Sequence, residues 1–239
     1  MLARGNLTDQ PAASQMNSVI WDHELAAKAR KWAGKYKFSH NPDTTVVLEL
    51  SCKDIRTFVN GHNNRRLMLA RGNLTDQPAA SQMNSVIWDH ELAAKARKWA
   101  GKYKFSHNPD TTVASGRFTT GENIYKVSST DPNYQIKMDD ALEAWFEEHK
   151  DYEYGPLSKD DFDSSGPAVG HYTQMVWSNS VYIGCGVSQR TENGGKVYYV
   201  VCNYGPSGNY LGQRPYKSGS ASNALKCPNN CSKPYGNRC

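Results

Sequence analysis

Residues 181–205 have the sequence VYIGCGVSQRTENGGKVYYVVCNYG, and this stretch decides the fold. Two runs rich in valine, isoleucine and tyrosine, 181–189 and 196–204, flank a turn that contains Asn193-Gly194. β-Branched and aromatic residues favour strands, and Asn-Gly is preferred in the two-residue type I′ turn. We therefore predict an antiparallel β-hairpin.

The same turn predicts which cysteines meet. With Asn193 and Gly194 at its centre, counting outward places Cys185 opposite Cys202 in a non-hydrogen-bonded pair. The Cα atoms of such a pair lie about 4.5 Å apart, which is compatible with a disulfide. We predict this bridge. Two free buried thiols are the alternative, and a glycine bulge after the turn would shift the register.

Three segments before the hairpin show helical periodicity. The first is 54–67, and the second begins after Asp89, a favourable N-cap residue, and runs to Ala100. The third has apolar and aromatic residues at helical spacing from Met138 to Tyr152. Gly, Pro, Ser and Asp crowd residues 155–170, which predicts a long surface loop.

The chain contains one internal duplication. Residues 1–46 recur letter for letter as residues 68–113. Repeat proteins stack several diverged units, whereas this copy is identical, occurs twice and stops abruptly. The second copy follows a predicted helix and continues into the rest of the chain, so we expect it to form the core. The predicted organisation is a duplicated partial segment (1–46), a junction (47–52), one domain (53–216) and a cysteine-rich tail (217–239).

Composition and charge exclude two classes of protein. A hydrophobic content of 38% with 21% charged residues is typical of globular proteins. The net charge is +5, but basic residues alternate with acidic ones and form no arginine-rich stripe, so we expect no nucleic-acid partner. No apolar run approaches the length of about 18 residues that a membrane span needs, so we expect no such span.

Cysteine usage indicates an oxidising compartment. The count of six is even, and three cysteines lie in the tail. The first residues supply neither the basic nor the apolar region of a secretory signal. We attribute this to an aberrant N-terminus and expect a secreted, extracellular protein.

Four cysteines remain outside the hairpin, and they allow three connectivities. Cys231 and Cys239 enclose a short loop with Pro234 and Gly236, which favours a local bridge. Cys52 with Cys227 would then tie the tail to the N-terminal side of the domain. We predict this pairing.

Several motifs resemble one protein family. Its two signatures are matched by residues 170–180, GHYTQMVWSNS, and 199–210, YVVCNYGPSGNY. Further blocks occur in the same order along the chain: His62-Asn63 with Arg66, Phe105-Ser106-His107, Gly121-Glu122-Asn123-Ile124-Tyr125 and Trp145-Phe146-Glu147-Glu148. The chain thus resembles the CAP superfamily of cysteine-rich secretory, venom allergen-like and plant pathogenesis-related group-one proteins.

The resemblance covers about residues 53–216 and implies an α+β fold. The expected architecture is an α-β-α sandwich, in which helices cover both faces of a small, mainly antiparallel sheet. A short cysteine-rich C-terminal tail follows it.

The resemblance also implies a central cleft with two histidines and two glutamates, which correspond to His107, Glu122, Glu148 and His171. Glu148 is preferred over Glu147 because the family places this glutamate three residues after the tryptophan. Two imidazoles can hold Zn²⁺ or another divalent cation, and carboxylates can complete the shell or orient a bound water. We expect these four residues to share one cleft and to form a metal site.

The function that the resemblance implies is a secreted binding module. Its expected ligand is a sterol or another lipid, and an extracellular protein is a possible partner. The alternative is a protease-like, metal-dependent hydrolase with Glu122 or Glu148 as general base. No Gly-x-Ser-x-Gly elbow occurs, so no nucleophile stands out and we assign no catalytic residue. We favour binding. A channel-modulating toxin would need a denser cysteine-rich domain than this tail.

Overall fold

The computed structural model describes residues 23–33, 45–228, 231–237 and 239. The chain forms two units, 1–41 and 42–239. The first is described only over helix α1 (His23–Ala33), so most of the first copy lies outside the described residues. No helix in the described ranges is long and apolar enough to cross a membrane.

The predicted hairpin lies at the centre of the second unit. Strand β4 (Tyr182–Glu192) pairs antiparallel with β5 (Gly195–Gly205). The two turn residues between them have φ angles of 50° and 80°, as a type I′ turn requires. Cys185 lies opposite Cys202 with their Cα atoms 4.1 Å apart, and the predicted disulfide is confirmed.

Three further strands complete a five-stranded sheet. Strand β3 (Gly121–Ser129) pairs antiparallel with β5, and β1 (Val46–Leu48) pairs antiparallel with β4. The short β2 (Ile87–Trp88) pairs with β4 in parallel. The sheet is therefore mainly antiparallel, as expected. Strand β1 begins at Val46, the last residue of the first copy, so the sheet begins before residue 53, the predicted start of the domain. The other domain boundaries stay a prediction.

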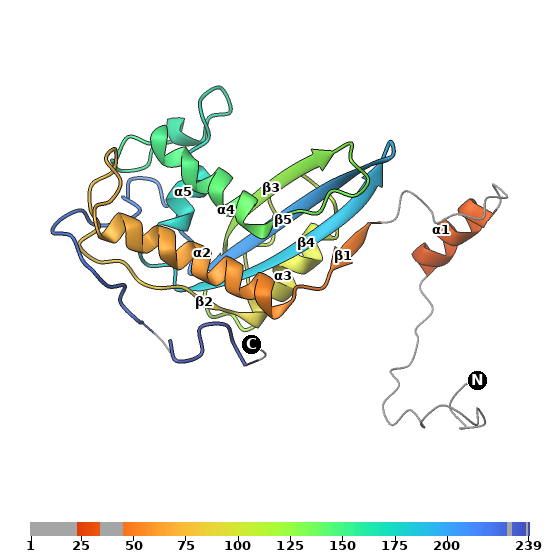
Figure 1. Ribbon diagram of the computed structural model, residues 1–239, viewed down its shortest axis with the longest axis horizontal. Helices are drawn as coiled ribbons and strands as arrows, with labels where there is room; N and C mark the ends of the chain where they lie inside the picture. The colour runs from red at the N-terminus through yellow and green to blue at the C-terminus, as the bar shows by residue number, and fades with distance from the viewer. Residues whose placement is uncertain (1–22, 34–44, 229–230, 238) are drawn as a thin grey trace. The chain divides into compact units, whose positions relative to one another are not determined.

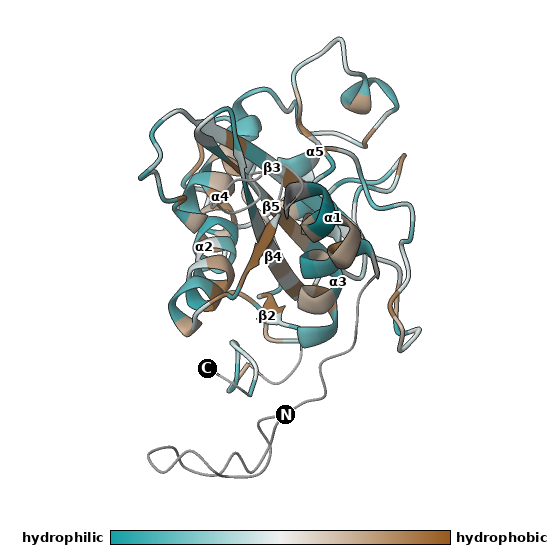
Figure 2. Cartoon of the chain, turned by 90° about the vertical axis from the view of Figure 1, so that its right-hand side faces the viewer, coloured by the Kyte–Doolittle hydropathy of each residue, from teal (hydrophilic) through white to brown (hydrophobic). Residues whose placement is uncertain are grey.

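Helices cover both faces of this sheet. Helix α3 (His90–Ala100) lies on one face, and α2 (Cys52–Ala70) and α4 (Met138–Glu147) lie on the other, as Figures 1 and 2 show. Helix α5 (Gly170–Met175) packs in the same core as α2 and α4 through Tyr172 and Met175. Gly184 allows α3 to pack closely, because a Cβ atom there would overlap the backbone of Ala93. The expected α-β-α sandwich is confirmed.

Local sequence determines where two of the helices begin. Asp89 accepts the backbone N–H of Leu92 with its side chain, so it caps α3 as predicted. Ser51 and Asp54 form a reciprocal capping box at the start of α2.

The third helix differs from its prediction. Helical spacing continues to Tyr152, but α4 ends at Glu147 and a tighter 3₁₀ turn follows, η1 (Glu148–Lys150). At this turn the Glu148 carboxylate bonds backbone N–H groups of α5. The predicted loop contains a second 3₁₀ turn, η2 (Asp160–Phe162).

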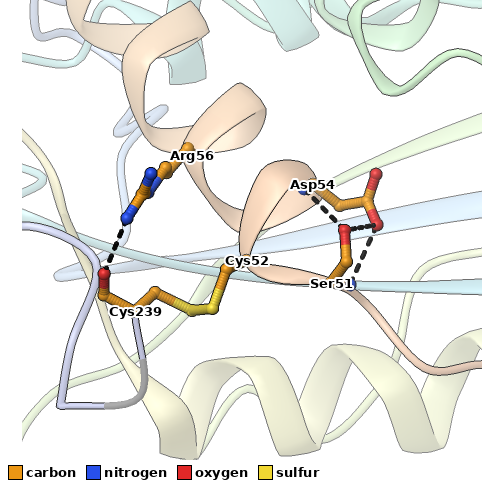
Figure 3. Close-up of a disulfide and its surroundings, with 5 residues drawn as sticks. All are labelled: Ser51, Cys52, Asp54, Arg56 and Cys239. Carbon is orange, nitrogen blue, oxygen red and sulfur yellow. Dashed lines mark hydrogen bonds between the residues drawn. A yellow bond between two sulfur atoms is a disulfide. The ribbon is translucent and has the colours of Figure 1, made fainter.

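The predicted pairing of the other cysteines is wrong: Cys231 does not pair with Cys239, nor Cys52 with Cys227. Cys52 is bonded to Cys239, and Cys227 to Cys231. In Figure 3, Arg56 of α2 donates to the carbonyl oxygen of Cys239 beside the bridge.

The reason lies in how the tail packs. The backbone of Ser85 donates to Lys226, and that of Trp88 donates to Pro234. Tyr235 donates to Asn60 of α2. These bonds hold the tail along residues 84–88 and bring its last residue to the start of α2, which leaves Cys227 and Cys231 to each other.

Candidate functional site

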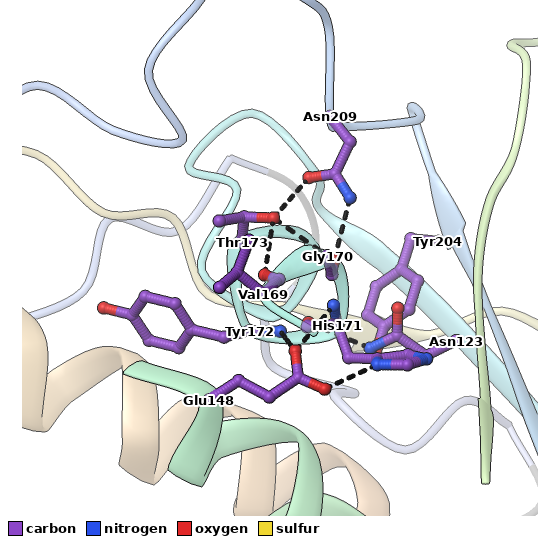
Figure 4. A network of polar contacts seen from close by, with 9 residues as sticks. All are labelled: Asn123, Glu148, Val169, Gly170, His171, Tyr172, Thr173, Tyr204 and Asn209. Atoms are coloured by element: carbon purple, nitrogen blue, oxygen red, sulfur yellow. Dashed lines mark hydrogen bonds and ion pairs between the residues drawn. The ribbon is translucent and has the colours of Figure 1, made fainter. Parts of the chain in front are cut away.

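Two of the four predicted site residues, Glu148 and His171, are hydrogen-bonded to each other and join η1 to the start of α5. Glu148 Oε1 lies 2.6 Å from His171 Nδ1. Its Oε2 accepts the backbone N–H groups of His171 and Tyr172, each at 3.0 Å (Figure 4). The indole of Trp145 stacks on the His171 ring with the planes 16° apart. Both oxygens of this carboxylate are therefore engaged in holding α5.

The other two predicted site residues, His107 and Glu122, are in contact where β3 begins. Glu122 Oε1 accepts the backbone N–H of Asn108 at 2.9 Å and lies 3.1 Å from His107 Nδ1. The Glu122 side chain is 8% exposed, whereas that of His107 is 68% exposed. Glu122 Oε2 is buried and has no hydrogen-bond partner among the described residues. This carboxylate has one buried oxygen without a hydrogen-bond partner among the described residues, unlike that of Glu148.

The four predicted residues form two hydrogen-bonded pairs, and only Glu122 among them lies on a strand. Neighbouring residues of a strand point to opposite faces of the sheet. Glu122 turns towards His107, while Asn123 turns to the other face and donates to the carbonyl oxygen of His171 at 3.0 Å. The structure thus brings together each histidine with one glutamate.

A zinc site usually has three or four protein ligands. Within the described residues, no group of three or more His, Cys, Asp or Glu side chains is arranged to hold a metal ion. Each pair supplies one imidazole and one carboxylate. The unpartnered Glu122 Oε2 fits a ligand or a metal better than the occupied oxygens of Glu148.

A buried network lies beneath His171. Asn123 donates to Tyr204 Oη at 3.1 Å, and Tyr204 Oη lies 2.9 Å from His62 Nε2. Since the Phe58 carbonyl can only accept, His62 Nδ1 bears the hydrogen in their 2.8 Å contact, and Nε2 accepts from Tyr204. Burial lowers the pKa of His62 to about 3. The neutral ring is therefore the form that the network uses.

Arg66 fixes the segment between α5 and β4. It is fully buried and donates to the carbonyl oxygens of Met175, Trp177, Ser180 and Asn84. Burial lowers the pKa of Arg66 to about 10. The motif residues His62 and Arg66 are thus structural.

A polar cavity of about 230 Å³ adjoins Glu122. Its lining consists of His107, Asn108, Asp110, Thr111, Thr120, Gly121, Glu122, Gln174, Asn203, Ser207, Gly208 and Asn209. Glu148 and His171 are not among these residues. Asn203 was not predicted from the sequence as a site residue, although it follows Cys202 in a quoted motif. The sequence feature that could have indicated Asn203 is its position as a polar residue among the valines and tyrosines of a predicted strand.

A larger cavity of about 420 Å³ lies between α2, α3 and the β1 side of the sheet. Leu48, Leu50, Ile55 and Trp88 form apolar parts of its wall, and Arg97 lies at its edge. This cavity was not predicted from the sequence. The sequence feature that could have indicated this cavity lies in the junction, where apolar Leu48 and Leu50 flank the charged Glu49.

Several known proteins are similar to this chain. Residues 59–204 match the family described as "CAP: Cysteine-rich secretory protein family". The chain is 37% identical over 179 residues to "Scoloptoxin SSD976" of Scolopendra dehaani, which covers 74% of this chain and 80% of that protein. It is 40% identical over 159 residues to "Venom allergen 5" of Vespa velutina, with coverages of 64% and 74%.

A solved structure described as "Crystal structure of NaASP2 with Zn2+" is also similar. Its TM-score is 0.61 and its sequence is 31% identical, with 78% of this chain and 95% of that chain covered.

Proposed function

Because this chain belongs to the cysteine-rich secretory protein (CAP) family, we propose that it is an extracellular binding module that takes up a sterol or another lipid. Three disulfides join its six cysteines, which supports an oxidising, extracellular setting. The observation that carries the lipid proposal is the apolar cavity between α2, α3 and β1.

The shape and lining of this cavity suit an apolar ligand. Its volume of about 420 Å³ falls within the range of small-molecule sites. Ile55 and Trp88 are buried members of the core, so this wall is firmly held. An acyl chain or a sterol ring placed here would leave water for an apolar surface, which favours binding.

An ion pair lies among the residues that line the same cavity. Arg97 Nη1 lies 2.5 Å from Glu49 Oε2, and both residues line the cavity. Both side chains are largely exposed. A ligand with an apolar body and one polar end, such as a sterol or a fatty acid, would place its polar end at this pair.

A divalent cation at the histidine and glutamate residues is the second part of the proposal. The buried, unpartnered Oε2 of Glu122 beside His107 supports it. The similar crystal structure of NaASP2 is one with Zn²⁺. When bound, such a cation would act as a Lewis acid. Glu122 and His107 are the residues best placed to hold it.

The contacts of the two glutamates leave one candidate general base for the alternative, a hydrolase. Glu148 uses both oxygens to hold α5, so a general base would have to be Glu122. Turnover of a peptide or ester panel that falls at least about a hundredfold in Glu122→Gln would contradict the binding proposal.

The lipid proposal is tested by filling the cavity. We expect Ala93→Phe, in the cavity wall on α3, to weaken binding of a fluorescent sterol or fatty acid at least about tenfold. Ala144→Phe, on an exposed position of α4, is the matched control and should bind normally. Thermal unfolding of both variants checks that they fold. Equal affinity in both variants, or no binding by the unaltered chain, would contradict the proposal.

A further inference from the structure

Residues 73–75 have the sequence Asn-Leu-Thr, which is an acceptor triplet for N-linked glycosylation. Such triplets also occur by chance, so the fold around them decides whether a glycan can be accommodated. Asn6 and Asn230 each begin a triplet of the same kind, but both lie outside the described residues. Asn73 is therefore the acceptor whose surroundings the structure describes.

The triplet lies in the loop that follows α2. Gly72, with a φ angle of 70°, ends the helix in the left-handed region. The backbone N–H of Asn73 then donates to the carbonyl oxygen of Met68 at 3.0 Å. Within the described part of the chain this is the only hydrogen bond of Asn73, so its side-chain amide is unengaged there. A glycan on this amide would break no hydrogen bond between described residues.

The exposure of the triplet also suits an acceptor. Asn73 and Thr75 are exposed, whereas Leu74 between them is half-buried and packs against the core. The next residue holds the loop in place, because Asp76 Oδ2 lies 2.5 Å from Nδ1 of the buried His149. An N-linked glycan is bulky and needs a surface position. The folded domain offers one at Asn73, on a loop that its neighbours fix.

We propose that Asn73 is a site of N-linked glycosylation. This inference rests on the extracellular setting of the proposed function, because the glycosyl donor is met in the secretory pathway. The Asn73 amide nitrogen forms a bond to the anomeric carbon of the terminal N-acetylglucosamine of an oligosaccharide and loses one proton. The bond from that carbon to a lipid-linked pyrophosphate breaks, and the lipid pyrophosphate leaves with the electron pair.

A glycan at Asn73 would lie far from the lipid cavity. Ile55, which lines that cavity, belongs to the first turn of α2, whereas Asn73 follows the end of the helix. The 19 residues of α2 span about 28 Å. Figure 1 shows α2 beginning near β1 and running away from it. The glycan therefore adds a hydrophilic surface at the end of α2 and leaves the lipid cavity open.

Intact mass of the full chain tests the site. The chain is produced in insect cells behind a cleavable secretory signal, so that it meets the glycosyl donor, and it is recovered from cell membranes and from the medium. Tryptic peptides cannot assign the site, because residues 5–28 and 72–95 are identical. Variants assign it instead. We expect Thr75→Ala to lose the mass of one glycan, and Thr75→Ser, which keeps the hydroxyl, to retain it.

The first copy supplies the matched control. Thr8→Ala makes the same change in the identical triplet that begins at Asn6. The double variant Thr8→Ala with Thr75→Ala should carry one glycan fewer than Thr8→Ala alone. Asn73→Gln should lose the same mass as Thr75→Ala. Thermal unfolding checks that each variant folds, and if Thr75→Ala does not fold, Asn73→Gln decides.

Two results would overturn the proposal. One is a folded Thr75→Ala or Asn73→Gln variant with the glycan mass of the unaltered chain. The other is an unaltered chain that carries no glycan after entering the secretory pathway. Lipid binding is measured separately, and Asn73→Gln should bind the fluorescent sterol or fatty acid as the unaltered chain does. A chain that binds lipid but is not glycosylated contradicts this inference alone, whereas a glycosylated chain that binds no lipid contradicts the lipid proposal alone.

Discussion

Glu148 holds His171 at both its ring and its backbone: Oε1 lies 2.6 Å from the ring Nδ1, and Oε2 accepts the backbone N–H. The same Oε2 also accepts from Tyr172. A carboxylate in this position stabilises the first turn of α5 and sets the orientation of the imidazole. The contacts of Glu148 are therefore structural, and the role expected from the sequence, that of a metal ligand or general base, stays a prediction.

Replacing Glu148 should destabilise the fold. We expect Glu148→Ala to lower the free energy of unfolding by about 2 kcal/mol, because charge-assisted hydrogen bonds to partly buried N–H groups are lost. Glu147→Ala is the matched control. Its carboxylate pairs with the exposed Lys150, and its loss should cost less than about 0.5 kcal/mol. Urea denaturation measures both, and equal losses would contradict this role.

The Cys52–Cys239 bridge should stabilise the protein more than the tail bridge. The cysteines it joins are 187 residues apart, against 4 for Cys227–Cys231. In the loop-entropy description, double alanine variants should lose about 5 kcal/mol and about 2 kcal/mol respectively. Chemical denaturation compares the two. Peptide mapping without reduction is the independent check, and a peptide linking Cys52 to Cys227 would show that the pairing described here is wrong.

Stability should depend on the protonation of His62. Burial lowers its pKa from 6.5 to about 3, so the unfolded chain binds the proton more readily than the folded one. The resulting stability is complete above pH 6.5 and falls as the pH drops towards 3, by about 1.4 kcal/mol per pH unit within that window.

The test is the slope of unfolding free energy against pH in His62→Gln. The glutamine can still accept from Tyr204 but does not titrate, so we expect a shallower slope between pH 6.5 and 3. An unchanged slope would mean that other groups account for the acid sensitivity.

Removing the first unit should leave the second one stable. We expect deletion of residues 1–41 to change the unfolding free energy of unit 42–239 by less than about 1 kcal/mol, because that unit has its own core. Deletion through Leu48 should cost more, since it removes β1 and exposes the edge of β4. Thermal unfolding of both truncated chains measures these changes in stability. A large loss in the shorter deletion would show that the first copy is integral.

Zinc uptake should depend on the two histidines. We expect His107→Ala combined with His171→Ala to abolish zinc binding in a calorimetric titration, because carboxylates alone compete poorly for zinc. Glu147→Gln, beside the site, should bind as the unaltered chain does. Retained affinity in the double variant would place the metal elsewhere, and absence of binding in the unaltered chain would contradict the metal proposal.

The hairpin and its disulfide could be predicted because their information is local. An Asn-Gly turn fixes the pairing of the strands that it joins, so the position of Cys185 relative to Cys202 follows from a count of residues. The cap at Asp89 is equally local. The family motifs supplied the rest of the architecture and the four candidate site residues.

Tertiary structure alone decided the other features, because they depend on segments far apart in the chain. The tail packs along residues 84–88, and this packing places Cys239 next to Cys52, to which it is bonded. Hydrogen bonding joins each candidate histidine to one glutamate, a pairing that a list of motif residues cannot reveal. The buried amide of Asn203 has no hydrogen-bond partner among the described residues, and this is visible only once its register partner Glu122 and the surrounding wall are in place, since whether a polar atom has a partner is a property of the packed interior.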